Sequence, residues 1–320
     1  MSTVRVLHIL MFAFCGMAAA QPYPSKPIRV VMGFPPGTTV DVLMRPIAQR
    51  LGEAFGQQLV LDNRPGATGI IATEMVVRAP ADGYTLLATP GSALTSSPHL
   101  HTKIAFDTLR DLKPVIQLGA FAYVLIAHPG VPAKSVKELV ALARAKPGVL
   151  TYGSTGLGSG FHLAGELFGS MAKINLVHVP YKGGPAVITD MLGGRIDLMF
   201  YSLAVVQPQI RAGRLRAIAV TGLARDPLLP EVPTMAEAGL PKYEIGGWHG
   251  LFAPANTPNA VVTQLNAAIA RILGTVEIKE LWISQGMGIV SGSPEAFAAL
   301  VKSDYEKYGA LIRSAGIKPE

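Results

Sequence analysis

Two glycine-rich segments that carry hydroxyl groups are the parts of this sequence best suited to hold an anion. Residues 33–39 read Gly-Phe-Pro-Pro-Gly-Thr-Thr, and residues 153–160 read Gly-Ser-Thr-Gly-Leu-Gly-Ser-Gly. Each segment lies between a short apolar run and a helical pattern. A helix N-terminus offers unpaired N–H groups and a favourable dipole to an anion, and glycine lets the backbone approach closely. Either segment alone also fits an ordinary strand-to-helix turn, whereas the pair favours a carboxylate gripped from two sides.

The sequence lacks the usual catalytic arrangements. No Walker lysine follows either segment, and Gly156, Gly158 and Gly160 alternate, which does not match a dinucleotide fingerprint. No Gly-x-Ser-x-Gly elbow occurs. A Ser-x-x-Lys pattern from Ser170 to Lys173 lies late in an expected helix, without partner motifs. We therefore expect no catalytic residue, no cofactor and no enzymatic activity.

The histidines do not have the spacing of a metal site. His99 and His101 are two residues apart, yet His162, His178 and His249 show no ligand spacing, so we expect no metal. His162 falls in the first turn of the helix that follows the second glycine-rich segment. Its side chain either points toward a ligand there or is a surface or capping histidine, and the sequence favours neither.

Short apolar runs that predict strands alternate along the chain with segments whose apolar residues recur at helical spacing, and these elements must position the two glycine-rich segments. Ser135 and Glu138 form a capping-box signature, and the dipeptides Thr257-Pro258 and Ser293-Pro294 each predict a helix start with a hydroxyl cap. A further helix is expected from about Asp41. Such alternation predicts two doubly wound α/β lobes with parallel sheets and helices on both faces. Strands are expected at 28–32, 59–61, 85–88, 123–127, 150–152, 176–179 and 216–220, and further helices at 71–77 and 161–171.

The N-terminus has the pattern of an export signal. A basic start at Arg5, an apolar run and three alanines predict a signal peptide over residues 1–20, cleaved after Ala20. Cys15, the only cysteine, leaves with it, so the mature chain has no disulfide. The chain carries a net charge of +7, which becomes +6 without Arg5, and its basic residues are scattered. We expect no membrane span and no nucleic-acid partner.

Ordered motifs occupy residues 23–29, 36–45, 63–67, 81–86, 152–154, 178–183, 229–239 and 248–254. Together they make the chain resemble the substrate-binding proteins of the tripartite tricarboxylate transporters, the TctC-like or Bug family. The resemblance implies a two-lobed periplasmic binding protein fold of the Venus-flytrap, type II-like class, with the ligand between lobes that close on it. Residues 21–122 and 250–320 would form lobe 1, and residues 123–249 lobe 2, with crossings near Phe121 to Tyr123 and near Trp248.

The resemblance also implies a ligand site made of loop amides and hydroxyls. Thr38 stands where the family usually has a second glycine, and Thr68-Gly69-Ile70 stands where it often has Gly-Gly-Asn. Both departures narrow the first pocket or make it less polar, which favours a flat or apolar-bodied diacid. The expected ligand-binding residues are Phe34, Gly37, Thr38, Asp41, Ala67, Gly69, Thr89, Ser92, Ser154, Thr155, Gly156, His162 and Tyr201.

The function implied is a monomeric periplasmic receptor for a small carboxylate. Family ligands include di- and tricarboxylates, acidic amino acids and aromatic acids, and the partners would be TctA/TctB-like permease subunits. The alternatives are a receptor that feeds a two-component sensor kinase, an exported hydrolase, and the effector-binding domain of a transcription regulator. The hydrolase lacks a visible nucleophile with its base, and the regulator lacks DNA-binding helices.

Overall fold

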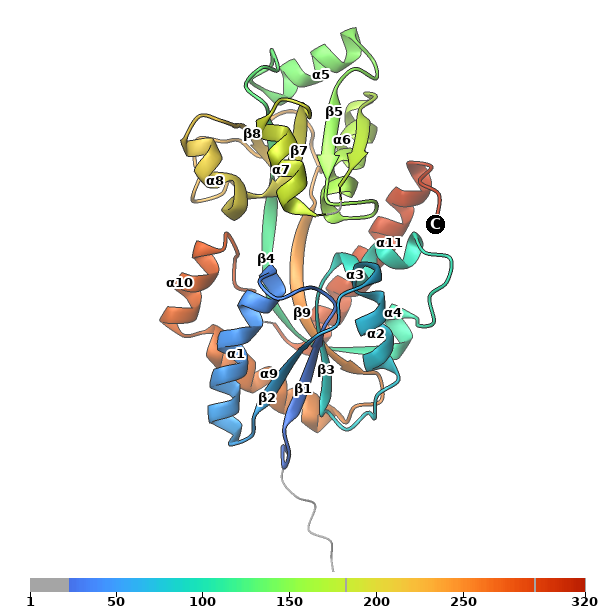
Figure 1. The fold of residues 1–320 in the computed structure, drawn as a ribbon, viewed down its shortest axis with the longest axis vertical. Helices are drawn as coiled ribbons and strands as arrows, with labels where there is room; N and C mark the ends of the chain where they lie inside the picture. Colours follow the sequence, from blue (N-terminus) through green and yellow to red (C-terminus); the bar gives the residue numbers. More distant parts are fainter. Residues whose placement is uncertain (1–22, 182, 291, 320) are drawn as a thin grey trace, which may run out of the picture.

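The computed structural model describes residues 23–319, apart from residues 182 and 291. Two α/β lobes lie along the long axis of the molecule (Figure 1). The predicted signal peptide lies outside the described residues. Within the described ranges, no single helix is long and apolar enough to cross a membrane. Only the pair Asn259–Leu273 and Val276–Ser284, bent by 77°, reaches that length and composition when the two helices are taken together.

Lobe 1 contains a mixed sheet in the order β2-β1-β3-β9-β4. β1 is parallel to β2 and β3, whereas β9 is antiparallel to β3 and β4. Successive side chains of β1 point to opposite faces, so Val30 packs in one core and Val31 in the other. The strands are β1 (Ile28–Met32), β2 (Leu59–Asn63), β3 (Thr85–Pro90), β4 (Leu112–Ala127) and β9 (Gly246–Pro254).

Helices cover both faces of this sheet. Apolar side chains of three helices pack on one face: α1 (Thr39–Phe55), α9 (Asn259–Leu273) and α10 (Val276–Ser284). The other face packs against α2 (Ile70–Val77) and the first half of α11 (Pro294–Ser314). The short helices α3 (Ser92–Thr95) and α4 (Thr108–Asp111) lie between β3 and β4 in the chain.

Lobe 2 repeats this layered arrangement around the second half of β4. Its strands are β5 (Thr151–Ser154), β6 (Val177–Pro180), β7 (Leu198–Ser202) and β8 (Arg216–Val220). β5 is parallel to β6 and β7, whereas β4 is antiparallel to β7 and β8. One face packs against α5 (Val136–Ala145) and α6 (Gly160–Ala172), and the other against α7 (Gly184–Leu192) and α8 (Leu203–Arg211).

Three elements connect the lobes. β4 pairs with β9 as far as Ala122 and then, from Tyr123, with β7 and β8 of lobe 2. The chain returns at Gly246, where β9 begins opposite Ala122. Residues 246–249, assigned to lobe 2 from the sequence, pair with lobe-1 strands.

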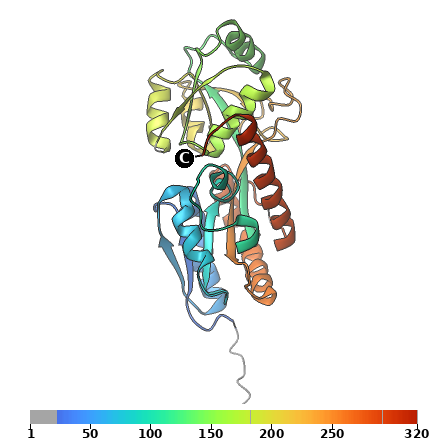
Figure 2. The ribbon, with the colours of Figure 1, turned by 90° about the vertical axis from the view of Figure 1, so that its right-hand side faces the viewer.

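Helix α11 is the third connection. It lies along one side of the molecule and passes the junction of the lobes (Figure 2). Phe297 and Val301, near its start, belong to a lobe-1 core, whereas Tyr308 and Ile312 belong to a lobe-2 core. The last turns of α11 therefore pack on lobe 2, although the sequence placed all of residues 250–320 in lobe 1.

The predicted α/β fold of two layered lobes is confirmed, but the expectation of parallel sheets is wrong in part. It holds among β1, β2 and β3 and among β5, β6 and β7. It fails for β4 and β9, which are antiparallel to their neighbours. The physical reason is that β4 and β9 carry the chain from one lobe to the other and back in opposite directions. Parallel pairing needs a crossover connection that brings the chain back to the same end of the sheet, and these two strands are not joined in that way.

The predicted helix caps are confirmed in two cases and wrong in one. Ser135 accepts a hydrogen bond from the N–H of Glu138 (3.2 Å), and Ser293 accepts one from the N–H of Ala296 (3.2 Å). The predicted cap at Thr257 does not form. Pro258 adopts an extended conformation (ψ 138°) and takes the capping position itself, so that α9 starts one residue later than expected.

Candidate ligand-binding cleft

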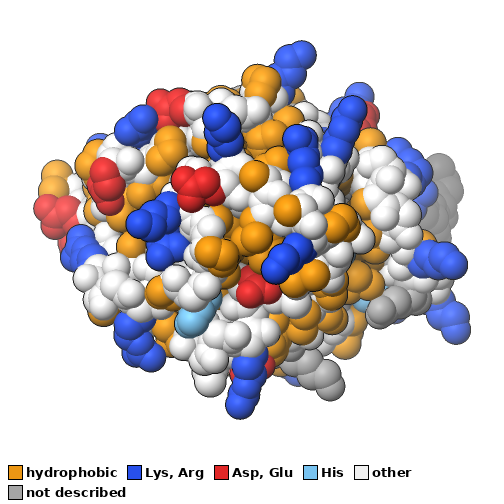
Figure 3. Space-filling model, turned by 90° about the horizontal axis from the view of Figure 1, so that it is seen from above, with side chains coloured by type: hydrophobic (Ala, Val, Ile, Leu, Met, Phe, Trp, Pro, Cys, Tyr) orange, Lys and Arg blue, Asp and Glu red, His pale blue; other side chains and the backbone are white. Residues whose placement is uncertain are grey.

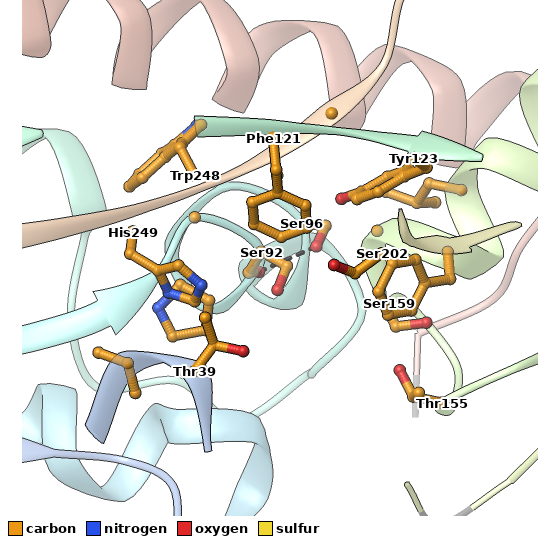
Figure 4. A pocket seen from close by; sticks show the side chains of 18 of the residues that line it. Thr39, Ser92, Ser96, Phe121, Tyr123, Thr155, Ser159, Ser202, Trp248 and His249 are labelled. Carbon is orange, nitrogen blue, oxygen red and sulfur yellow. Dashed lines mark hydrogen bonds between the residues drawn. The ribbon is translucent and has the colours of Figure 1, made fainter. Parts of the chain in front are cut away.

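A cavity of about 230 Å3 is lined by residues of both lobes and of the strands that join them. Figure 4 shows Thr39 and His249 on one side of this space and Thr155, Ser159 and Ser202 on the other. Lobe 1 contributes the loop before α1 and the start of α3, and lobe 2 contributes the starts of α6 and α8. The cavity is therefore an interlobe cleft at which several helix N-termini meet.

The start of α1 forms one wall of the cleft. Thr38 precedes the helix, and its hydroxyl donates to the carbonyl of Pro35 (2.8 Å), so its side chain makes no capping hydrogen bond. Thr38, Thr39 and Val40 line the cavity. First-turn N–H groups have no partner inside their own helix, and here they lie beside a space that an anion can occupy.

Asp41 holds the loop before α1 in place and does not line the cleft. Its carboxylate accepts the N–H of Gly37 (2.9 Å) and pairs with Arg45 (2.9 Å), and its side chain is buried. Burial alone would raise the pKa of Asp41, but the hydrogen bonds from Gly37 and Arg45 outweigh it and hold this pKa below its usual value. Gly37 is also outside the lining, at a positive φ of 83°.

The other expected lobe-1 residues divide between the cleft and its support. Phe34 and Ser92 line the cavity. Gly69, buried at a φ of 95°, lies behind Phe34: a Cβ at this position would be 3.2 Å from the Phe34 ring. Thr89 is buried and Ala67 is exposed, and both lie outside the lining. The loop around residue 69 thus supports the Phe34 wall.

The hydroxyl of Ser154 in lobe 2 is directed into the lobe. The Ser154 Oγ atom is 2.7 Å from Nε2 of His178 and accepts the N–H of Gly156 (3.1 Å), and Ser154 is fully buried. Thr155, the next residue, lines the cleft, whereas Ser154 and Gly156 do not. Burial lowers the pKa of His178 to about 4, so this ring is neutral at pH 7.

His162 also belongs to this buried network. Its Nδ1 atom accepts the N–H of Gly158 (3.0 Å), and its ring stacks on that of His178 with centroids 3.9 Å apart. Ser159 caps α6 by accepting the N–H of His162 (3.2 Å). His162 is buried and lies outside the lining. The geometry is that of a loop stabilised by its own side chains, which corresponds to the capping alternative raised for this histidine.

The start of α8 is the open helix end in lobe 2. Ser202 precedes α8 and lines the cleft, and its side chain makes no capping hydrogen bond. Tyr201 also lines the cleft, and its ring lies 4.5 Å from that of Phe161. Burial raises the pKa of Tyr201 to about 12, so it presents a neutral phenol.

The cleft has apolar walls and no formal charge. Among the described residues that line it, none is Lys, Arg, Asp or Glu. An acid held here would therefore be stabilised by backbone N–H groups, hydroxyls and helix dipoles, and not by an ion pair. Its carbon skeleton would pack against aromatic rings, contributed by Phe34, Phe121, Phe161, Tyr201 and Trp248.

Charged side chains are dispersed over the outside of lobe 2. Seen from the end that carries α5, lysine and arginine side chains are interspersed with apolar and uncharged ones (Figure 3). A dispersed positive charge of this kind attracts anions weakly over the whole surface.

The structure brings together only part of the expected site. Five of the expected residues line the cleft: Phe34, Thr38, Ser92, Thr155 and Tyr201. Eight do not: Gly37, Asp41, Ala67, Gly69, Thr89, Ser154, Gly156 and His162. Sequence reasoning missed Ser159, Ser202 and His249. Ser202 had a usable signal, since it ends the apolar run 198–202 just before a helix, but without a glycine-rich segment.

Residues 43–317 match the profile of the tripartite tricarboxylate transporter family receptor, TctC. The chain belongs to the TctC family. This confirms the resemblance drawn from its motifs. BugT of Bordetella pertussis (strain Tohama I) is 34% identical over 325 residues, which cover 99% of both chains. A UPF0065 protein of Pseudomonas sp. (strain P51), from the tcbD-tcbE intergenic region, is 39% identical over 91% of this chain and 86% of its own length.

Solved TctC-type structures share the fold over nearly the whole chain. R. palustris Rpa4515, determined with adipate, has a TM-score of 0.83 at 35% identity, covering 93% of this chain and 100% of its own. MatC (Rpa3494) from Rhodopseudomonas palustris, with bound malate, has a TM-score of 0.79 at 28% identity, covering 91% and 100%. TctC proteins are substrate-binding receptors, and solved members such as BugD are periplasmic binding proteins.

Proposed function

We propose that this protein is a periplasmic receptor that captures a small dicarboxylate in the interlobe cleft and delivers it to a TctA/TctB-like membrane permease. In this proposal the chain is exported and its signal peptide is removed after Ala20. It acts by binding alone, as a monomer, with no cofactor. The lobes close on the ligand about β4 and β9.

The observation that carries the proposal is the meeting of uncapped helix starts around an uncharged, aromatic-walled space. Thr38 at α1 and Ser202 at α8 lie in different lobes, and neither side chain caps its helix. Each helix start suits one carboxylate. Phe34, Phe121 and Phe161 supply apolar walls between them. A ligand with a carboxylate at each end and an apolar body fits this arrangement.

Two solved relatives support the choice of ligand class. Rpa4515 was determined with adipate and MatC with malate, and both are dicarboxylates. The proposed binding set consists of the residues that line the cleft at the helix starts, together with the walls: Phe34, Thr38, Thr39, Ser92, Thr155, Ser159, Tyr201 and Ser202.

A thermal-shift screen of the purified mature protein tests this function. The panel holds di-, tri- and monocarboxylates, with neutral amides of the same acids as matched controls. A ligand at 100 times its Kd adds about 2.7 kcal/mol to the free energy of unfolding, which raises the melting temperature of a chain this long by about 4 °C. We expect one group of dicarboxylates to produce this shift and their amides to produce none. A panel without any stabilising acid would refute the proposal.

A further inference from the structure

His249 has an unusual position in the wall of the cleft. It lies on β9, opposite Pro90 of β3 and Gly119 of β4, and only 5% of its surface is exposed. Its ring stacks on Phe121 with centroids 5.8 Å apart. In Figure 4 the imidazole and Thr39 lie on the same side of the cavity, which both residues line.

Neither ring nitrogen of His249 has a hydrogen-bond partner among the described residues. Most buried polar atoms in folded proteins are paired, because an unpaired one loses its hydration without compensation. Leucine or phenylalanine would fill the same volume without that cost. A polar ring kept unpaired at a cavity wall is therefore suited to an interaction with whatever enters the cavity.

The protonation state of His249 defines what it can bind. Burial lowers its pKa to about 4, so at pH 7 the ring is neutral, with one N–H donor and one acceptor nitrogen. The other titratable side chains that line the cleft are the phenols of Tyr123, Tyr201 and Tyr308, and burial raises the pKa of each. Both ring nitrogens of His249 are buried in the wall of the cleft, and none of the described residues that line the cleft offers a carboxylate that would compete for its donor.

We propose that His249 is a specificity-determining residue, whose imidazole N–H binds the lobe-1 carboxylate of a dicarboxylate and so selects diacids over monoacids of the same length. This inference rests on the proposed function. It assigns the lobe-1 carboxylate to the space between His249 and the start of α1 at Thr39, and the other carboxylate to the start of α8 at Ser202. A monoacid leaves one of these polar ends unpaired.

The test replaces the imidazole by an apolar ring of similar size. Calorimetry on wild type and His249→Phe compares succinate, glutarate, adipate, pimelate and terephthalate with butyrate, valerate, hexanoate, heptanoate and benzoate. For the diacid that wild type binds most tightly, we expect His249→Phe to weaken binding about tenfold to a hundredfold. Binding of the matching monoacid should stay within threefold or tighten, so the preference for the diacid collapses.

Two further measurements separate ligand contact from a structural role. His249→Phe removes two unpaired buried nitrogens, so the empty variant should melt about 2–4 °C higher than wild type while binding the diacid less well. His249→Gln keeps an N–H donor and should recover part of the lost affinity. The matched control is His128→Phe: His128 accepts the N–H of Gly130 outside the cleft lining, and its loss should leave both affinities unchanged.

The outcomes distinguish this inference from the proposed function. If wild type binds a diacid and His249→Phe binds it equally well, the role of His249 is refuted and the receptor function stands. An equal loss of diacid and monoacid binding in His249→Phe also refutes selection by His249. If wild type binds none of the diacids, the dicarboxylate function itself is refuted, and the role of His249 with it.

Discussion

The glycine-rich segments before α1 and before α6 are similar in sequence but differ in how their polar groups are used. At α1 the Thr38 side chain turns back to Pro35 and leaves the helix start uncapped. At α6 Ser159 caps the helix, while Ser154 and His162 bond within the lobe. The first segment therefore leaves its helix start open to a ligand. The second satisfies its helix start with its own side chains, and only Thr155, Ser159 and Gly160 of this segment line the cleft.

This difference shows that a strand, a glycine-rich loop and a helix do not by themselves make an anion site. What matters is whether side chains of the loop already satisfy the N–H groups of the helix start. In lobe 2 the open helix start is that of α8, where Ser202 makes no capping bond and no glycine-rich segment precedes it. The open helix starts that the two lobes present to the cleft are thus preceded by different kinds of loop.

Closing the open start of α1 should have the largest effect on binding. In Thr38→Asp the new carboxylate can cap the first-turn N–H groups and also repel an incoming acid. Two like charges about 4 Å apart repel by about 4 kcal/mol near a protein surface, so the affinity for the best diacid should fall more than a hundredfold. Calorimetry measures the loss, and circular dichroism melting checks that the fold persists.

Thr38→Asn is the matched control for that charge, because it caps the helix with a neutral side chain of the same shape. It should lose about tenfold in affinity, less than the aspartate variant. Equal affinities in wild type and Thr38→Asp would mean that the start of α1 does not face the bound acid.

Alanine substitutions of Ser202 and Ser154, both in lobe 2, should separate an effect on ligand binding from an effect on stability. A hydrogen bond to a charged group contributes about 1.5–3 kcal/mol, so Ser202→Ala should weaken diacid binding about tenfold to a hundredfold and leave the melting temperature nearly unchanged. Ser154→Ala removes the buried partner of His178. It should cost about 1–3 kcal/mol of stability and change affinity less than threefold. Calorimetry and urea unfolding of both variants give the two quantities.

The reverse pattern would contradict this assignment. If Ser154→Ala lost affinity while its stability stayed constant, the second glycine-rich segment would be a ligand loop after all. The comparison between the two segments would then fail.

Lowering the pH should destabilise the buried network of Ser154, His162 and His178 in lobe 2, by a smaller amount than the substitutions above. The pKa of His178 is about 4 in the folded protein and about 6.5 when unfolded. The folded state therefore binds fewer protons, and the stability present above pH 6.5 is lost as the pH falls from 6.5 toward 4. A pKa shift of this size corresponds to a loss of about 3 kcal/mol in the free energy of unfolding for a fully buried ring. For the partly exposed ring of His178 we expect about half of that loss.

Urea unfolding of the empty protein at pH 7.5 and pH 5 measures this loss. His178→Gln cannot take up the proton, so its stability should change less between these two pH values. His249→Phe provides the lobe-1 counterpart, since burial also holds the pKa of His249 near 4. Wild-type stability that stays flat over this interval would show that these rings are not buried in neutral form.

Local patterns in the sequence predict most of the elements. Apolar periodicity located β2, β3 and α2, and the hydroxyl-proline signal located the cap of α11 at Ser293, because these depend on neighbouring residues only. The cap predicted at Thr257 is wrong for a local reason as well, because Pro258 takes the capping position itself. The antiparallel direction of β4 and β9 depends on how the lobes are connected, which periodicity does not encode.

The site was harder to predict because it depends on where each polar group points. Ser154 and Thr155 are neighbours with similar chemistry, yet one is bonded to His178 inside lobe 2 and the other lines the cleft. Alternation along β5 and partners distant in sequence decide this. His249 stands apart from any motif for a ligand, and only its unpaired nitrogens in the folded protein single it out.

The shared helix α11 has a consequence for how the protein unfolds. Phe297 and Val301 complete one lobe's core and Tyr308 and Ile312 the other's, so neither lobe can melt without uncovering apolar surface of its neighbour. Domains joined only by a flexible tether unfold independently. We therefore expect the helix to make the two lobes a single cooperative unit of unfolding, with one transition in calorimetry.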